Sequence, residues 1–316
     1  MGMMQETQKT QDYALPFYEW EYQEYNPTVS QRYMHLMEYN SDARQVVMWG
    51  GHGFFTRNWT WAWDGTGWEV RATVCPRTRG HAAMAYMKST QTMMMFGGVD
   101  MNLQVLGETW GLNGSTWDLI TTEGPTPRIG HDMVYDEARD EIILFGGRDL
   151  SCKIQYNDTW SWTTEYGWRL LTTDVSPSPR AFHAMVYDSK REIIVMTGGS
   201  ETCRIVALPK VWEWNGQNWK EIPNNGPARA AHRLVYDSHR KVTIMFGGYD
   251  EVGTQHNDIW EWNGHYWKTT ATNQLIPLPR SSHGMAYDEN RNMTLMYGGV
   301  WNAVGDLGDT WKLKRN

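Results

Sequence analysis

A pair of adjacent glycines recurs six times along the chain at nearly even spacing, and no other feature limits the fold as strongly. Each pair follows a short run of residues with high β-propensity, and successive pairs begin 47 to 52 residues apart. The pairs are Gly50-Gly51, Gly97-Gly98, Gly146-Gly147, Gly198-Gly199, Gly247-Gly248 and Gly298-Gly299. A fixed period of this length indicates a repeat architecture in which each repeat is one supersecondary unit. Six copies predict six units.

Each period contains four short segments with strand character, which the third repeat shows most clearly. In that repeat the segments are His131–Tyr135, Ile142–Phe145, Thr159–Trp162 and Trp168–Leu171. The turns between them are polar and rich in Gly or Asn, as in Asn113-Gly114, and no segment has an apolar period of about 3.6 residues. Each unit is therefore predicted to be a four-stranded antiparallel sheet.

These repeats resemble the kelch-repeat family over nearly the whole chain. The matching motifs are the Gly-Gly pairs, the spaced tryptophans, and Pro-Arg-x-x-His at Pro127–His131, Pro179–His183 and Pro279–His283. The resemblance implies an all-β fold: a six-bladed kelch-like β-propeller with four antiparallel strands per blade. It leaves function open, because such propellers include enzymes, sugar-handling proteins and protein-binding modules.

The two ends of the chain predict how the ring closes. The last repeat stops after Thr310–Leu313 and lacks a fourth strand, whereas Phe17–Tyr22 carries Trp20 at the spacing of a fourth-strand tryptophan. We expect this N-terminal strand to complete the last blade, which removes an open sheet edge. The whole of residues 1–316 is then one propeller domain, in which residues 1–14 form a flexible or lightly packed segment.

Composition excludes several classes of partner. The chain has 316 residues and a formal net charge of −7, which argues against the phosphate neutralisation that nucleic-acid binding needs. No run approaches the roughly 18 apolar residues of a membrane span, and Met1–Asp12 lacks the pattern of a secretory signal. Three cysteines are too few for a disulfide framework. We therefore expect a cytoplasmic monomer.

Functional residues are expected on the face formed by the loops after the second and fourth strands of each blade, here called the upper face. These loops are long and irregular, whereas the turns after the first and third strands, on the lower face, are short and uniform. Variable loops on a rigid scaffold commonly carry function.

Two residue types recur at the start of each first strand. Arginines precede the repeat histidines, and near the channel mouth they are candidates for binding an anion. The alternative is that each ties down a neighbouring carbonyl or stacks on a tryptophan. The arginines are Arg32, Arg79, Arg128, Arg180, Arg229 and Arg280. The histidines are His35, His81, His131, His183, His232 and His283, which we interpret as structural braces rather than metal ligands.

Most of the 19 tryptophans follow the repeat and are expected to pack between blades. Trp49 takes the place of a strand phenylalanine, and only Trp59 and Trp301 do not follow the repeat. Both belong to upper loops, of blades one and six. With them on this face are His52, Phe54, Phe55, Tyr249 and His256. This asymmetric rim suits a sugar, an aromatic metabolite or a peptide, although such a loop can also fold onto its own aromatics.

Catalytic chemistry has weaker support in the sequence. Cys152 and Cys203 lie in upper loops that contain no histidine, so a Cys–His pair is not visible and ordinary loop cysteines are expected. No phosphate or dinucleotide loop is present, and no cofactor or metal is expected. Acid/base work by carboxylates of the upper loops, Glu201, Asp250, Glu251 and Asp306, stays open.

The leading hypothesis is a binding propeller whose upper face and channel mouth take a small polar or anionic ligand or a peptide. One alternative is a cofactor-free isomerase, lyase or cyclase that acts on a sugar acid or secondary metabolite in the same pocket. The other is a protein-interaction scaffold.

Overall fold

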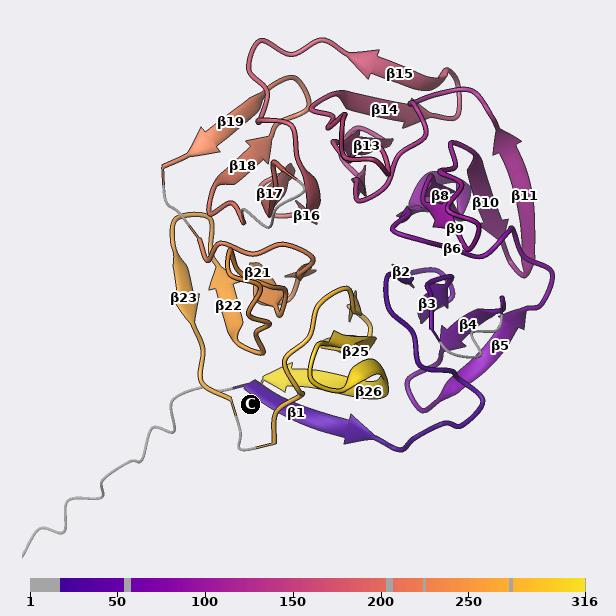
Figure 1. The fold of residues 1–316 in the computed structure, drawn as a ribbon, viewed down its shortest axis with the longest axis vertical. Helices are drawn as coiled ribbons and strands as arrows, with labels where there is room; N and C mark the ends of the chain where they lie inside the picture. The colour runs from indigo at the N-terminus through magenta and orange to yellow at the C-terminus, as the bar shows by residue number, and fades with distance from the viewer. Residues whose placement is uncertain (1–17, 54–57, 203–206, 224–225, 273–274, 316) are drawn as a thin grey trace, which may run out of the picture.

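The strands are arranged as six four-stranded antiparallel sheets around a central axis, as a computed structural model of the chain shows (Figure 1). The structure describes residues 18–53, 58–202, 207–223, 226–272 and 275–315. Within these ranges the one helical element is a 3-10 turn at Lys88–Thr90, and no helix is long and apolar enough to cross a membrane. The six-bladed propeller predicted from the repeats is confirmed.

The blades follow one another along the chain, each from its inner strand outward. Blade 1 contains β2 (Leu36–Asn40), β3 (Gln45–Trp49), β4 (Thr60–Trp63) and β5 (Trp68–Ala72). Blade 2 contains β7 (Ala83–Met87), β8 (Thr92–Phe96), β10 (Thr109–Asn113) and β11 (Thr116–Thr121), with the short pair β6 (Arg79–Gly80) and β9 (Val99–Asp100) beside it. Blade 3 contains β12 (Asp132–Asp136), β13 (Glu141–Phe145), β14 (Thr159–Thr163) and β15 (Gly167–Leu171).

The second half of the ring has the same organisation. Blade 4 contains β16 (Ala181–Asp188), β17 (Ile193–Ser200), β18 (Val211–Trp214) and β19 (Trp219–Ile222). Blade 5 contains β20 (Arg233–Asp237), β21 (Val242–Phe246), β22 (Ile259–Trp262) and β23 (Trp267–Thr269). Blade 6 contains β24 (Gly284–Asp288), β25 (Met293–Trp301), β26 (Gly305–Arg315) and, as its outer strand, β1 (Tyr18–Gln23).

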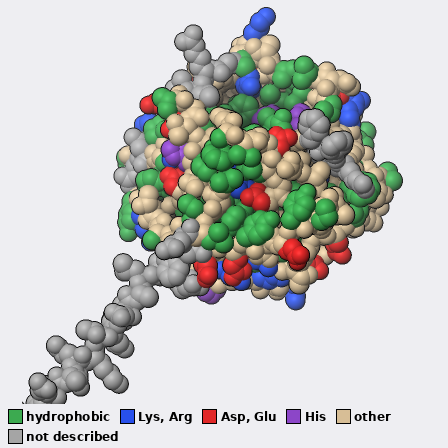
Figure 2. All heavy atoms as spheres, turned by 60° about the horizontal axis from the view of Figure 1, so that its bottom comes forward, with side chains coloured by type: hydrophobic (Ala, Val, Ile, Leu, Met, Phe, Trp, Pro, Cys, Tyr) green, Lys and Arg blue, Asp and Glu red, His purple; other side chains and the backbone are tan. Residues whose placement is uncertain are grey.

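Strand β1 closes the ring, as the sequence predicts. It pairs antiparallel with β26 from Tyr18 opposite Arg315 to Gln23 opposite Thr310. Trp20 is 1% exposed and its ring lies 5.0 Å from that of Phe246 in blade 5, so the strand also joins two blades. Figure 2 shows this side of the molecule, with acidic and basic side chains mixed along its lower edge.

The Gly-Gly pairs follow the second strand of blades 1, 2, 3 and 5 and lie near the end of the second strand of blades 4 and 6, where the chain passes close to the next blade. In blade 3, Gly146 and Gly147 have φ of 67° and 94°, a conformation that residues with a Cβ rarely adopt. A Cβ on Gly146 would lie 2.7 Å from the carbonyl oxygen of Arg180. Gly147 N donates a hydrogen bond to that oxygen at 2.8 Å. The repeated glycines therefore allow adjacent blades to meet backbone to backbone.

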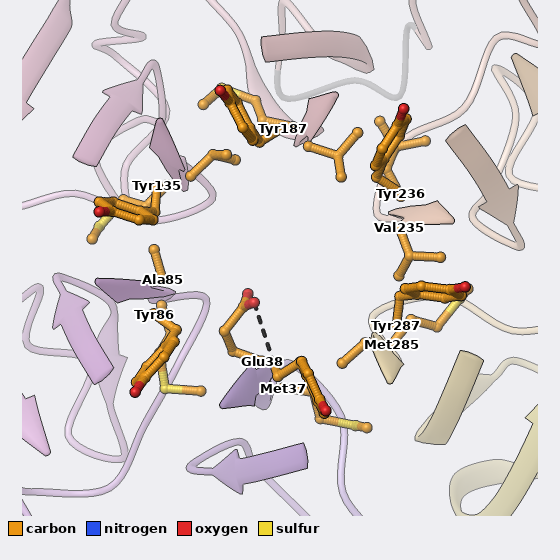
Figure 3. A pocket seen from close by; sticks show the side chains of 18 of the residues that line it. Met37, Glu38, Ala85, Tyr86, Tyr135, Tyr187, Val235, Tyr236, Met285 and Tyr287 are labelled. Carbon is orange, nitrogen blue, oxygen red and sulfur yellow. Dashed lines mark hydrogen bonds between the residues drawn. The ribbon is translucent and has the colours of Figure 1, made fainter. Parts of the chain in front are cut away.

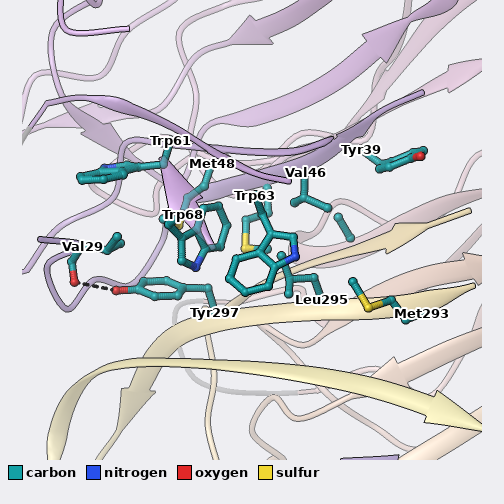
Figure 4. Packing of buried hydrophobic residues seen from close by; sticks show 12 residues of the cluster. Val29, Tyr39, Val46, Met48, Trp61, Trp63, Trp68, Met293, Leu295 and Tyr297 are labelled. Atoms are coloured by element: carbon teal, nitrogen blue, oxygen red, sulfur yellow. Dashed lines mark hydrogen bonds between the residues drawn. The ribbon is translucent and has the colours of Figure 1, made fainter. Parts of the chain in front are cut away.

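Tryptophans fill the space between blades, and four of those in fourth strands donate a hydrogen bond to the preceding blade. The fourth-strand Trp68 donates from Nε1 to Thr310 Oγ1 of blade 6 at 3.0 Å, and Trp117, Trp168 and Trp219 bond in the same way to a threonine of the preceding blade. Between blades 1 and 6, Trp61, Trp63 and Trp68 pack with Tyr297 and Leu295 (Figure 4). The tryptophan excess thus serves mainly the architecture.

Candidate functional site

The central channel contains a cavity of ≈ 260 Å³. Its walls are the inner strands β2, β7, β12, β16, β20 and β24, and it reaches the lower face at the turns that follow them (Figure 3). Here this opening is called the lower mouth, and the turn residues that border it are Ser41, Lys88, Glu137, Ser189, Ser238 and Glu289. Its lining mixes apolar side chains with polar and charged groups, and a concave surface with a few placed polar groups is typical of sites for small molecules.

A closed ring of backbone hydrogen bonds surrounds the other end of the channel. One residue of each blade donates its N–H to the carbonyl oxygen of the corresponding residue in the preceding blade, at 2.7 to 3.2 Å. The residues are Met34, His81, Gly130, Phe182, Ala231 and Ser282. The Phe182 ring reaches across Gly130 to the His81 ring, 4.9 Å away between centroids. The channel is therefore constricted toward the upper face.

A ring of tyrosines, one from each inner strand, surrounds the channel near the lower mouth (Figure 3). Several hydroxyls bond to the neighbouring blade: Tyr86 donates to Asp42 at 2.5 Å and Tyr287 to Asp237 at 2.9 Å. The six tyrosines are Tyr39, Tyr86, Tyr135, Tyr187, Tyr236 and Tyr287. Because the ring repeats in every blade and its hydroxyls join blades, it shapes the mouth as scaffold.

Three charged residues break the symmetry of the channel wall. One residue before the tyrosine, blade 1 has Glu38 where the other blades have Ala85, Val134, Val186, Val235 and Ala286. Three residues before it, blades 3 and 5 have Asp132 and Arg233 where the others have Leu36, Ala83, Ala184 and Gly284. All three charged residues border the cavity, and Glu38 points into it (Figure 3). They come from alternate blades, so they approach the axis from three sides.

The two carboxyl groups have perturbed acidities. Burial raises the pKa of Glu38 to about 8. The hydrogen bond from Tyr39 N and the positive charge of Arg233 lower this pKa, whereas the negative charge of Asp132 raises it further. Burial also raises the pKa of Asp132 to about 6, against the charge of Arg233. Asp132 accepts hydrogen bonds from Met185 N at 2.7 Å and Met133 N at 2.9 Å, which favour its ionised form. At neutral pH Glu38 is mainly protonated and Asp132 mainly ionised.

Arg233 supplies the positive charge of the channel. It is half-buried and borders both the large cavity and a smaller one of ≈ 40 Å³ below the ring of backbone hydrogen bonds. Its charge acts on the pKa values of groups in blades 1, 2, 3, 5 and 6, which indicates a guanidinium near the axis. Nε donates to His283 O at 2.9 Å. Among the described residues, no carboxylate forms a salt bridge with it.

Glu38→Gln is expected to stabilise the protein at high pH. The folded pKa of Glu38 lies above the unfolded value of about 4.3, so the folded state loses stability as the pH rises from that value to about 8. The glutamine removes this loss. The melting temperature should match wild type at pH 4 and exceed it by a few degrees at pH 9, whereas exposed Glu123→Gln should show no such trend. A constant difference across this range would contradict the pKa of Glu38.

The repeated arginines are buried and bonded within their own blades. Arg128 contacts Asp158 through both terminal nitrogens, at 2.6 and 2.8 Å, and donates to Gly146 O at 2.9 Å. Arg79, Arg229 and Arg280 also pair with an acidic residue. Arg32 and Arg180 bond instead to serines and carbonyls, and burial lowers the pKa of each to about 10. Their contact with a ligand stays a prediction.

The histidine ring has five members rather than six. His35, His131, His183, His232 and His283 share one position, where blade 2 has Ala82. His81 lies one residue earlier, in the ring of backbone hydrogen bonds. Grouping His81 with the others was therefore wrong, because the residue three after Arg79, where the other blades have their histidine, is Ala82, and His81 lies one residue before it. Burial lowers the pKa of His131 and His232 to about 3, which keeps both neutral.

The predicted aromatic rim is spread over several loops. Trp59 is partly buried against the hydrophobic cluster of blades 1 and 6, with its ring 5.8 Å from that of Trp61. His52 forms a bridge with Tyr33 at the edge of blade 1. His256 Nε2 lies 3.0 Å from Asp250 Oδ2 in its own loop. Phe54 and Phe55 lie outside the described residues.

Two loops of this rim do meet. Gln255, beside His256, donates to Val300 O at 2.7 Å and accepts from Asn302 N at 2.7 Å, so the loops of blades 5 and 6 that carry His256 and Trp301 touch. Tyr249 forms a bridge with Ala230 and a second with Gln255. Binding of a ligand by Tyr249, His256 and Trp301 stays a prediction.

The cysteines differ in state. Cys152 is disulfide-bonded, which the sequence analysis did not predict, whereas Cys75 is a free thiol whose pKa is raised by burial. Cys203 lies outside the described residues. Cytoplasmic location stays a prediction.

Sequence reasoning missed Glu38, Asp132 and Arg233. The signal was present: Glu38 stands at an inner-strand position that is apolar in the other five blades, and Asp132 and Arg233 stand at one that is apolar or glycine in the other four. These departures become visible only when the six repeats are aligned on the inner-strand tyrosine and each aligned position is compared between blades. Departures from the repeat were expected in the loops, and the inner strands were interpreted as scaffold.

Comparisons with known proteins agree with this fold. The sequence profile of the KLHDC2/KLHL20/DRC7 Kelch-repeats domain matches residues 56–226. The solved structure of YjhT is similar, with a TM-score of 0.71 and 14% sequence identity over 91% of this chain and 95% of that one. At this identity the likeness concerns the fold alone. No curated protein matches the chain in sequence.

Proposed function

The chain belongs to the Kelch-repeat family of β-propellers, and from this premise we propose that it is a binding propeller that holds a small polar ligand inside its central channel. The observation that carries the proposal is the cavity of ≈ 260 Å³, in which two carboxyl groups and an arginine interrupt inner strands that otherwise repeat from blade to blade. Scaffold residues repeat from blade to blade, whereas a binding site departs from the repeat.

The size of the cavity limits the ligand. A volume of ≈ 260 Å³ equals that of about nine waters in the liquid and suits a molecule of about a dozen non-hydrogen atoms. A folded peptide segment or a second protein does not fit inside. Entry is proposed from the lower mouth, because the backbone ring and Phe182 narrow the upper end.

Thermal shift against a library of small polar metabolites tests the proposal. A ligand that binds only the folded protein raises its melting temperature, because binding stabilises the folded state by RT ln(1 + [L]/Kd), about 2.7 kcal/mol at one hundred times Kd. Arg233→Met should abolish these shifts, whereas Arg77→Met, which changes a half-exposed arginine of an upper loop, should preserve them. Shifts that survive Arg233→Met would contradict the channel site.

The enzyme alternative has one observation in its favour. Burial raises the pKa of Glu38 to about 8, near the pH at which a general acid or base works best, and Glu38 faces the cavity. A cofactor-free isomerase or lyase in the same channel would lose its turnover in Glu38→Gln while still binding substrate. Turnover of a library hit that depends on Glu38 would favour the enzyme.

A further inference from the structure

We infer that the channel takes a small zwitterion, with a carboxylate of the ligand on Arg233 and its ammonium between Asp132 and Glu38. The inference rests on the proposed function and names the chemical class of its ligand. It starts from the signs and positions of the three charged side chains in the cavity wall.

Arg233 requires an anionic or strongly accepting partner. Its guanidinium borders the cavity, and among the described residues the side chain makes one hydrogen bond, through Nε to His283 O. Guanidinium groups bind carboxylates through two parallel hydrogen bonds. A half-buried cation in an apolar wall is costly until such a partner is present.

Asp132 and Glu38 make a purely anionic ligand unsuitable. Asp132 lies in the same layer as Arg233, with blade 4 between their blades, and Glu38 comes one layer nearer the lower mouth from blade 1. An anion drawn to Arg233 is repelled by Asp132. A ligand that also carries an ammonium group satisfies both signs, because the ammonium can donate to the two carboxyl groups.

The rest of the wall sets the body of the ligand. Ala85, Val134, Val186 and Val235 surround the axis at the level of Glu38. Such side chains offer no hydrogen bonds, so the uncharged part of the ligand is apolar. Small amino acids with aliphatic bodies have this combination.

Lys88, Glu137 and Glu289 are the charged residues of the lower mouth. Lys88 Nζ is paired with Glu137 Oε1 at 2.8 Å, and both side chains are more than 40% exposed. Solvent screens this pair, so it contributes little to the choice of ligand inside the channel.

Calorimetric titration with matched probes tests the inference. The zwitterions are leucine and 6-aminohexanoate, the anions are 4-methylpentanoate and hexanoate, and the amines are 3-methylbutylamine and hexylamine. At least one zwitterion should bind at least about tenfold more tightly than its matched anion and amine, because each of these leaves a buried charge unpaired. Asp132→Asn should reduce the preference for the zwitterion over its matched anion. Arg233→Met should reduce the preference for the zwitterion over its matched amine. Folding of both variants is checked by their melting curves.

Two failures are distinguishable. The inference would be overturned if a zwitterion and its matched anion bound with equal affinity. It would also be overturned if xylitol and glucose bound through Arg233 and no zwitterion bound. In both cases the channel would still be a binding site. Both the inference and the proposed function would be overturned by two results together. None of these probes would give heat on titration, and the metabolite library would contain no hit that depends on Arg233.

Discussion

Deletion of residues 1–24 is expected to lower the melting temperature by roughly 10 °C or more. The deletion removes β1, whose Tyr18 and Trp20 are 2% and 1% exposed, and leaves β26 with an unpaired edge. Tyr18 also donates to Glu261 Oε1 of blade 5 at 2.6 Å. Blades 5 and 6 therefore lose packing, hydrogen bonds and a shared strand at once.

Two further variants make this expectation decisive. Trp20→Ala keeps the strand and should cost about 3–5 kcal/mol, because a large buried ring is removed from its contacts with Phe246 and Trp311. Deletion of residues 1–14 leaves every described residue in place and is the matched control. Melting of the longer deletion at the wild-type temperature, as measured by circular dichroism, would show that the ring does not depend on β1.

Arg128→Met is expected to destabilise the protein by about 2–4 kcal/mol. The substitution removes the partner of Asp158, whose side chain is 25% exposed, and the donor to Gly146 O. Partial exposure of Asp158 keeps the cost below that of a fully buried unpaired charge. Arg77→Met is the control, because the Arg77 side chain is 54% exposed and its partner Asp100 keeps the hydrogen bonds from Asn102 N and Gln104 N, so a smaller loss of stability is expected.

The same variant separates the two interpretations of the arginine ring. If the arginines are structural, Arg128→Met lowers the free energy of unfolding in denaturant titration and leaves ligand binding intact in the fraction that is folded. An unchanged free energy of unfolding together with loss of ligand binding would favour the anion-binding interpretation instead.

The fold was predictable because the constraint that shapes it repeats. Each Gly-Gly pair marks the same close backbone approach, and each fourth-strand tryptophan the same position between blades, so six weak signals reinforce one another. The closing strand was predictable for the same reason, since Trp20 keeps the spacing of the other fourth strands.

The candidate site was not predictable in the same way, because a site departs from the repeat. Asp132 and Arg233 each stand in an inner strand beside a histidine of the repeated motif, where the motif draws attention away from the departure. The register of His81 was missed because a histidine stands next to the expected position, although the spacing of three residues from Arg79 leads to Ala82. The burial of the arginines was not predictable, because it depends on carbonyls of the same blade and, for four of the six, on Asp158 and its equivalents, which lie some 30 residues further along the chain.

Trp59 illustrates a departure with a structural explanation. It occupies the position that Glu108, Asp158, Asp258 and Asp309 hold in other blades, and packs on the cluster of blades 1 and 6. Arg32 of that blade accordingly has no acidic partner among the described residues and bonds to Ser30. An irregular tryptophan on a functional face is therefore weaker evidence for a site than an irregular charge in the channel.

A crystal structure grown with the strongest ligand from the metabolite library tests the central claim most directly. The account predicts electron density for the ligand inside the channel, with an acceptor group within hydrogen-bond distance of Arg233 and the apolar part against Val235 and Ala85. Density on the upper face near Tyr249, His256 and Trp301, with the channel free of ligand, would contradict it.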